Sequence, residues 1–260
     1  MKMKRIINLQ WTQLKRNRLF YFGFLSFALV AVFLSRLVFN PQIQDCSGGV
    51  AAVCLPTLMS YIVVLFVMEN TAVLINQDYA DGTMYLMLTA GYSRTAIYFI
   101  KMLFVMCINS VMGVVLMLIP VVFHTMIYGW GDSIDLGGYA IRLLLLAVFL
   151  YRVSALMILL SFILKNRLLT IGCGIALIVV ECRLTANYQI RNVSVPILSA
   201  FNKIFDYTFQ IKSHFISGYV TFDIKDCMNV AQQVNSCFVS LVIVLLCALV
   251  GCGYFQWNDI

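Results

Sequence analysis

Long apolar stretches alternate with short polar segments along this chain. A helix that crosses a bilayer needs about 20 mostly apolar residues. Six stretches meet or approach this length: residues 19–39, 50–75, 97–126, 141–164, 168–180 and 237–255. The fifth is short unless it continues to residue 182 or 184. The pattern therefore predicts an all-α membrane protein with six transmembrane helices.

The composition indicates the same class. Of the 260 residues, 62% are hydrophobic and 11% are charged, whereas soluble domains carry roughly 25% charged residues. A chain this apolar cannot present a polar shell to water. The first apolar stretch exceeds the roughly 7–15 residues of a signal-peptide core, so we expect it to be a retained span.

The positions of lysine and arginine predict an orientation. Six of the 18 basic residues precede residue 19, and segments 76–101 and 165–167 add four more. Because basic loops stay in the cytoplasm, we expect both termini there, in a multi-pass protein of the plasma membrane. Residues 1–18 then form a cytoplasmic amphipathic helix and residues 19–260 the six-span domain. The loop at about 183–234 holds five basic residues yet is assigned outside, since long loops translocate largely regardless of charge.

Motifs for metal, nucleotide or nucleic-acid chemistry are missing from the sequence. The nine cysteines include no Cys-x-x-Cys pair, and the two histidines form no cluster, so no metal site is predicted. Cys46, Cys182 and Cys227 lie near or outside span ends and are candidates for disulfides. No Gly-x-x-x-x-Gly-Lys motif occurs, so we expect no ATP site of that type and no cofactor on this chain. The basic N-terminus is interpreted as a cytoplasmic flank, with no nucleic-acid partner.

The segment at residues 77–94, QDYADGTMYLMLTAGYSR, is the most informative polar stretch. Asp78 and Asp81 are residue types that start helices. Residues 83–88 then predict a short helix, and Gly91 suits the left-handed position that ends one. Its apolar face would consist of Met84, Leu86, Met87 and Leu88. A short helix with such an apolar face suits a groove on a cytoplasmic partner. The alternative is that this helix rests on the lipid headgroups.

This segment resembles the coupling region of ABC-2-type transporter permeases. Bacterial members often show an acid-x-x-x-Gly-Thr pattern, a leucine-rich turn, Ser-Arg, and a lysine one helical stretch later. The matching positions here are Asp78, Gly82, Thr83, Leu86, Leu88, Ser93, Arg94 and Lys101. The chain departs from the pattern with Asp78 where glutamate is usual and Gly91 where many members have proline.

The resemblance implies a fold, partners and an activity. The fold would be an ABC-2 (type V ABC exporter-like) transmembrane domain with a cytoplasmic coupling helix, which pairs with a second copy or a sister permease. A separate cytoplasmic ABC ATPase would bind ATP and Mg, so this chain would not itself be an enzyme. The cargo would be an amphipathic peptide such as a peptide antibiotic, a drug or a lipid-like molecule, and export is expected. The residues expected to couple to the ATPase are Asp78, Asp81, Gly82, Thr83, Met84, Leu86, Met87, Leu88 and Arg94.

Charged residues inside the apolar stretches suggest other functions. Charges in a bilayer are costly and usually face protein or water. Glu69 and Arg152 could form a structural ion pair, or could serve an ion-coupled secondary transporter. A third hypothesis is a membrane sensor or assembly protein that holds a signalling partner through the short cytoplasmic helix.

Overall fold

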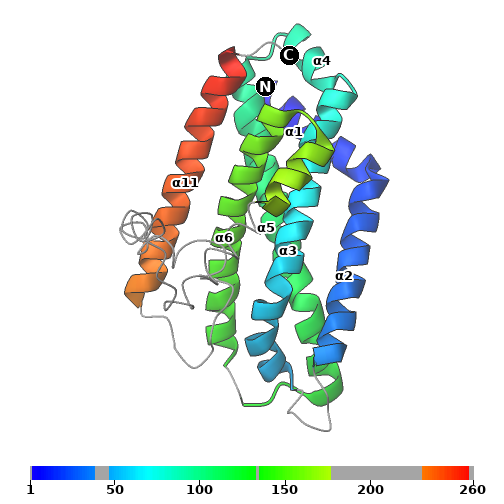
Figure 1. Cartoon of the computed structure of the whole chain (residues 1–260), viewed down its shortest axis with the longest axis vertical. Helices are drawn as coiled ribbons and strands as arrows, with labels where there is room; N and C mark the ends of the chain where they lie inside the picture. Colours follow the sequence, from blue (N-terminus) through cyan, green and yellow to red (C-terminus); the bar gives the residue numbers. More distant parts are fainter. Residues whose placement is uncertain (1, 39–46, 133–134, 177–229, 258–260) are drawn as a thin grey trace, which may run out of the picture.

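The computed structural model describes residues 2–38, 47–132, 135–176 and 230–257 (Figure 1), and every regular element in these ranges is an α-helix. The elements are α1 (Lys2–Arg16), α2 (Arg18–Val38), α3 (Gly48–Ala80), α4 (Thr83–Thr89), α5 (Arg94–Tyr128), α6 (Leu136–Leu164), the helix Arg167–Ala176 and α11 (Val230–Trp257). The long helices run side by side, and α1 and α4 lie at one end of the bundle, called here the α4 end.

The helix boundaries agree with the apolar stretches to within a few residues. Four helices are long and apolar enough to cross a membrane: Phe20–Leu37, Arg94–Tyr128, Leu136–Leu164 and Cys237–Trp257. They correspond to the first, third, fourth and sixth predicted spans. The second predicted span lies in α3, which has 33 residues.

The fifth predicted span is only partly described. Its described part is the apolar helix Arg167–Ala176. The rest of that span and most of the predicted loop at 183–234 lie outside the described residues, as do Cys46, Cys182 and Cys227. The last helix, α11, begins at Val230 and so includes the final residues assigned to that loop.

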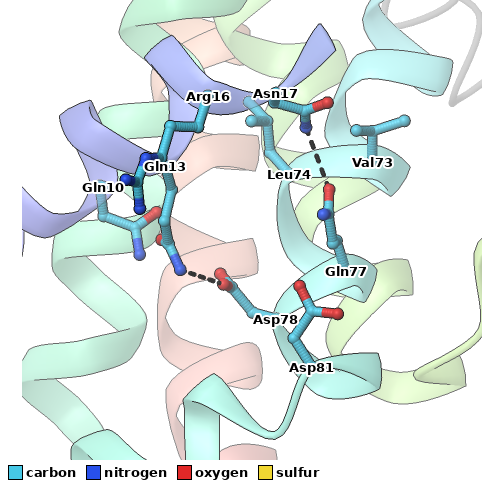
Figure 2. Close-up of a pocket in the computed structure, with 9 residues that line it drawn as sticks. All are labelled: Gln10, Gln13, Arg16, Asn17, Val73, Leu74, Gln77, Asp78 and Asp81. Carbon is cyan, nitrogen blue, oxygen red and sulfur yellow. Dashed lines mark hydrogen bonds between the residues drawn. The ribbon is translucent and has the colours of Figure 1, made fainter. Parts of the chain in front are cut away.

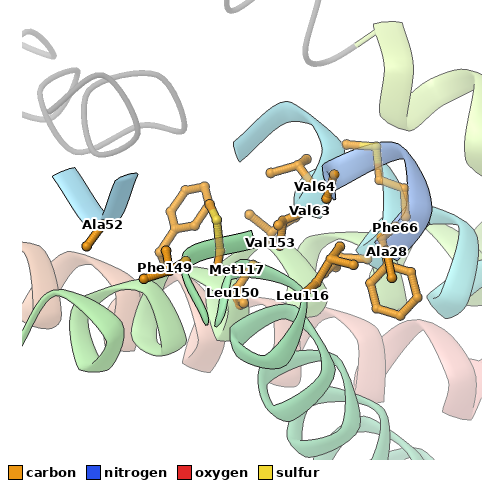
Figure 3. Close-up of a cluster of buried hydrophobic side chains, with 14 of the residues drawn as sticks. Ala28, Ala52, Val63, Val64, Phe66, Leu116, Met117, Phe149, Leu150 and Val153 are labelled. Atoms are coloured by element: carbon orange, nitrogen blue, oxygen red, sulfur yellow. The ribbon is translucent and has the colours of Figure 1, made fainter. Parts of the chain in front are cut away.

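Two clusters of buried apolar side chains fill the bundle. One joins α2, α3, α5 and α6 in the half away from α4 and includes Phe66, Leu116 and Leu150 (Figure 3). The other, called here the α4-end core, joins α1, α3, α4, α5, α6 and α11. Its members include Ile6, Ile75, Met84, Met87, Ile97, Tyr98, Phe162 and Phe255. The second cluster fixes the geometry of the predicted coupling segment.

A buried polar network links the three central helices. Asn109 on α5 accepts a hydrogen bond from Asn70 at 2.6 Å and donates to the hydroxyls of Thr71 at 2.8 Å and Ser154 at 3.0 Å. All four side chains are buried. Hydrogen bonds of this kind connect helices where apolar burial provides little driving force, as in a bilayer.

The far end of the bundle is closed by backbone contacts. Ser47 caps α3 by accepting a bond from Val50 N, and the next two amides bond to the chain that follows α5. These bonds run from Gly48 N to Gly129 O at 2.8 Å and from Gly49 N to Trp130 O at 2.6 Å. The ends of α3 and α5 are thereby joined.

Candidate functional site

The turn between α3 and α4 differs from the sequence prediction. Asp78 and Asp81 do not start the short helix. Asp78 lies in the last turn of α3, and Asp81 follows that helix with its amide still bonded to Gln77 O at 2.8 Å. Because these backbone bonds persist, the break comes only at Gly82, whose φ of +68° suits glycine. From Gly82 the chain enters α4, whose first turn is capped by no side chain of the described residues.

The short helix itself is confirmed. It has seven residues, Thr83–Thr89, and Gly91 follows it with a φ of +79°. Gly91 therefore occupies the left-handed position that the sequence predicted.

The predicted apolar face of α4 is wrong in its composition. Met84 and Met87 point into the α4-end core and are 1% and 5% exposed. Tyr85 and Leu86 are 61% and 63% exposed. Side chains three or four apart share a helix face, so the consecutive residues 86, 87 and 88 cannot all face one partner. Tyr85, which the sequence pattern does not single out, lies beside Leu86 on the exposed side of α4.

A buried ion pair anchors the end of α3 that leads into α4. The ammonium of Lys101 on α5 donates to Asp78 Oδ2, and both side chains are buried. Gln13 on α1 donates to Asp78 Oδ1 at 3.1 Å (Figure 2). One carboxylate thus joins α1, α3 and α5, and Asp78 and Lys101, which the motif singled out separately, meet directly.

Arg94 is held against the end of α11. Its guanidinium Nη1 lies 3.4 Å from the carbonyl oxygens of Phe255 and Gln256. These carbonyls belong to the last turns of α11, where a cation is favourable because a helix C-terminus carries partial negative charge. Ser93 caps α5 by accepting a bond from Ala96 N at 3.3 Å. The Ser-Arg pair therefore starts α5 and connects it to α11.

The two intramembrane charge candidates do not form a pair with each other in the described part of the chain. Glu69 accepts from Arg167 at 3.3 Å, and these side chains are 35% and 41% exposed. Arg152 is buried on α6 with its guanidinium 5.2 Å from the centre of the Phe149 ring. Among the described residues, no cluster of three or more histidine, cysteine or acidic side chains could hold a metal ion.

These features define a helical membrane protein with a short surface helix packed at one end of its bundle. A family model described as ABC-2 family transporter protein matches residues 6–181. The match covers about two thirds of the chain and includes α1 from Ile6, the whole α3–α4–α5 segment and the helix Arg167–Ala176. The chain belongs to the ABC-2 family of transporter proteins and is a multi-pass membrane protein. A search of curated proteins found no match to this sequence.

Proposed function

We propose that this chain is the membrane-spanning permease subunit of an ATP-binding cassette transporter. A separate cytoplasmic ABC ATPase binds ATP and Mg and hydrolyses the nucleotide, and two permease chains, identical or sister chains, share the pathway. Family membership supports the general function. The placement of α4 supports the more detailed proposal that this helix contacts the ATPase. The helix is short and firmly packed on the bundle, and it exposes two large apolar side chains, Tyr85 and Leu86.

The contacts of α4 suggest how motion would pass to the spans. Tyr85 and Leu86 offer an apolar contact to the ATPase, and Met84 and Met87 connect the other face of α4 to α3, α5 and α11 through the α4-end core. Protein interiors are close-packed and transmit displacement rather than absorb it. A shift of α4 on nucleotide-driven closure would therefore move the ends of these helices.

The predicted coupling residues would have different tasks. Asp81 and Gly82 form the turn before α4, and Thr83 is the first residue of α4. All three are at least partly exposed, so they can lie in the contact. Leu88 is half-buried. Asp78 and Arg94 act as positioning residues, since their partners belong to α1, α5 and α11 of the same chain.

The proposed cargo is an amphipathic peptide, drug or lipid-like molecule, and the proposed direction is export. In the proposed orientation the α4 end faces the cytoplasm, which puts α1 and the end of α11 on the same side as the ATPase. Methionines such as Met106 and Met117 are buried inside the bundle, and their flexible side chains can adapt to varied apolar cargo once a pathway opens.

Co-purification of the ATPase tests this function. The full chain is solubilised from its native host beside Leu86→Asp and the control Leu136→Asp. Both substitutions place one charge on an exposed leucine, at 63% and 69% exposure, but Leu136 begins α6 at the opposite end of the bundle. We expect a Walker-motif ATPase to co-purify with the native chain and the control, and to be lost from Leu86→Asp. Equal recovery with both variants would refute the role of α4, and absence of any ATPase from the native sample would refute the permease function.

A further inference from the structure

A pocket of about 220 Å³ lies between α1 and the end of α3 that leads to α4 (Figure 2). Gln10, Gln13, Arg16 and Asn17 line it from the α1 side, and Gln77 and Asp81 are among the residues that line it from the α3 side. Sites for drug-sized ligands measure roughly 300–1,000 Å³. This pocket therefore fits a smaller, polar group.

The α1 side of the pocket offers hydrogen-bond donors. Gln10 is only 4% exposed, and its amide Nε2 has no hydrogen-bond partner among the described residues. A buried donor without an acceptor is costly, so an acceptor supplied by a ligand would bind favourably there. Arg16 adds an exposed guanidinium that forms no ion pair within the described part of the chain. An amide donor and a guanidinium together suit a phosphate.

The α3 side carries the opposite charge. Asp78 is already paired with Lys101 and Gln13. Asp81 is exposed and pairs with no other described residue. The two charges available to a ligand are thus one cation and one anion in a single small pocket. A zwitterion with an anionic phosphate and a cationic ammonium matches both.

The pocket lies beside the start of the first helix that is long and apolar enough to cross a membrane. Arg16 and Asn17 come a few residues before the apolar segment Phe20–Leu37, and Val73 and Leu74 supply an apolar wall. Phospholipid headgroups occupy this depth. We propose that the pocket binds the headgroup of an aminophospholipid of the phosphatidylethanolamine type, with its phosphate at Gln10 and Arg16 and its primary ammonium at Asp81.

Lipid retention by the full chain tests this site. The delipidated chain in detergent is titrated with phosphatidylethanolamine, phosphatidylcholine or phosphatidylglycerol of matched acyl chains, and bound lipid is counted by native mass spectrometry. We expect phosphatidylethanolamine to bind most tightly, because the quaternary ammonium of phosphatidylcholine has no N–H to donate and phosphatidylglycerol has no ammonium. Equal retention of the three lipids by the native chain would refute the assignment.

Two variants separate the phosphate contact from the ammonium contact. Arg16→Gln should weaken retention of all three lipids by about tenfold, the usual size of a lost charge-assisted hydrogen bond. Asp81→Asn should remove only the preference for phosphatidylethanolamine over phosphatidylcholine. Both positions are exposed, so the fold should survive, and a thermal melt checks this.

Lys15→Gln is the matched control. Lys15 precedes Arg16 on α1 but lies outside the pocket, with its ammonium 5.6 Å from the centre of the Trp11 ring. We expect it to retain lipid like the native chain. If Lys15→Gln loses lipid to the same extent as Arg16→Gln, the lipid binds to the basic surface of α1 in general and not to the pocket. Soluble O-phosphoethanolamine should bind far more weakly than the lipid. Equally tight binding would refute the proposal that the ligand is a membrane lipid.

Discussion

At the residue scale, the Asp78–Lys101 pair is the contact with the largest consequences. Both side chains are buried, and Gln13 satisfies a further lone pair of the carboxylate. Removing one member of a buried pair is strongly destabilising because it leaves an uncompensated charge, whereas replacing both members can be nearly neutral. The pair joins the chain before α4 to α5, so its loss should loosen the whole α4 region.

Lys101→Met should therefore destabilise the protein by about 3–5 kcal/mol. The double variant Asp78→Asn, Lys101→Met should lose much less, because a neutral amide still accepts from Gln13 and no buried charge remains. The measurement is the midpoint of thermal unfolding in detergent, compared at equal protein concentration.

Arg167→Met is the control for that experiment. It breaks the Glu69–Arg167 pair, whose side chains are both more than a third exposed, so we expect a cost of about 0–1 kcal/mol. A double variant that melts as early as Lys101→Met alone would show that the pair matters through packing and not through charge.

The sequence could indicate these residues but not their contacts. Asp78 and Lys101 were both found as parts of one motif, yet nothing in their spacing of 23 residues says that a turn and a second helix bring them together. The sequence offers Arg152 as a candidate partner for Glu69 because both lie in apolar stretches. The structure places Glu69 against Arg167, since the side chain that meets a given charge depends on how the helices are rotated against each other.

At the element scale, the long helices were predictable because the bilayer sets their length. The apolar stretch 19–39 became α2, Arg18–Val38, and the stretch 97–126 became α5, Arg94–Tyr128. The exposed side of α4 was not predicted, because seven residues with apolar side chains on both faces give no clear amphipathic pattern. The packing of α4 on the bundle decides which face is buried.

The docking of α11 depends on a small residue. At Gly251 an added Cβ would overlap the ring and hydroxyl of Tyr98, and that hydroxyl donates to Cys247 O at 2.9 Å. Tyr98 also packs against Phe162 with ring centres 4.8 Å apart. The close approach of α5 and α11 therefore requires glycine at this position.

Gly251→Leu should push α11 away from α5 and cost about 1–3 kcal/mol, the usual range for overpacking. Thermal unfolding in detergent measures the effect. Gly253→Leu, two residues further along α11, is the matched control, because no atom of the described residues lies within 4 Å of an added Cβ there. If Gly251→Leu and Gly253→Leu have the same midpoint of thermal unfolding, α11 does not pack against Tyr98 in the way the structure shows.

At the scale of the whole molecule, the ends of the helices constrain the topology. The ends of α6 and α11 lie together, since the rings of Phe162 and Phe255 pack edge to face with centres 5.1 Å apart, and α11 starts at the opposite end of the bundle. A chain that leaves α6 at the α4 end must reach the other end before α11 begins. The six-span topology predicts one crossing there, and the apolar helix Arg167–Ala176 lies where that crossing would start.

Reporter fusions test this topology. With six spans and the α4 end in the cytoplasm, a fluorescent protein fused after Trp257 should be bright and alkaline phosphatase fused there should be inactive. Fusions after Asp132, which follows α5, should give the opposite result, because α5 runs from the α4 end to the other side. Active phosphatase at both positions would mean that α6 and α11 are separated by an even number of crossings. An even number would put the C-terminal ends of α6 and α11 on opposite sides of the membrane, whereas the structure places them at the same end of the bundle. The six-span prediction would then be wrong.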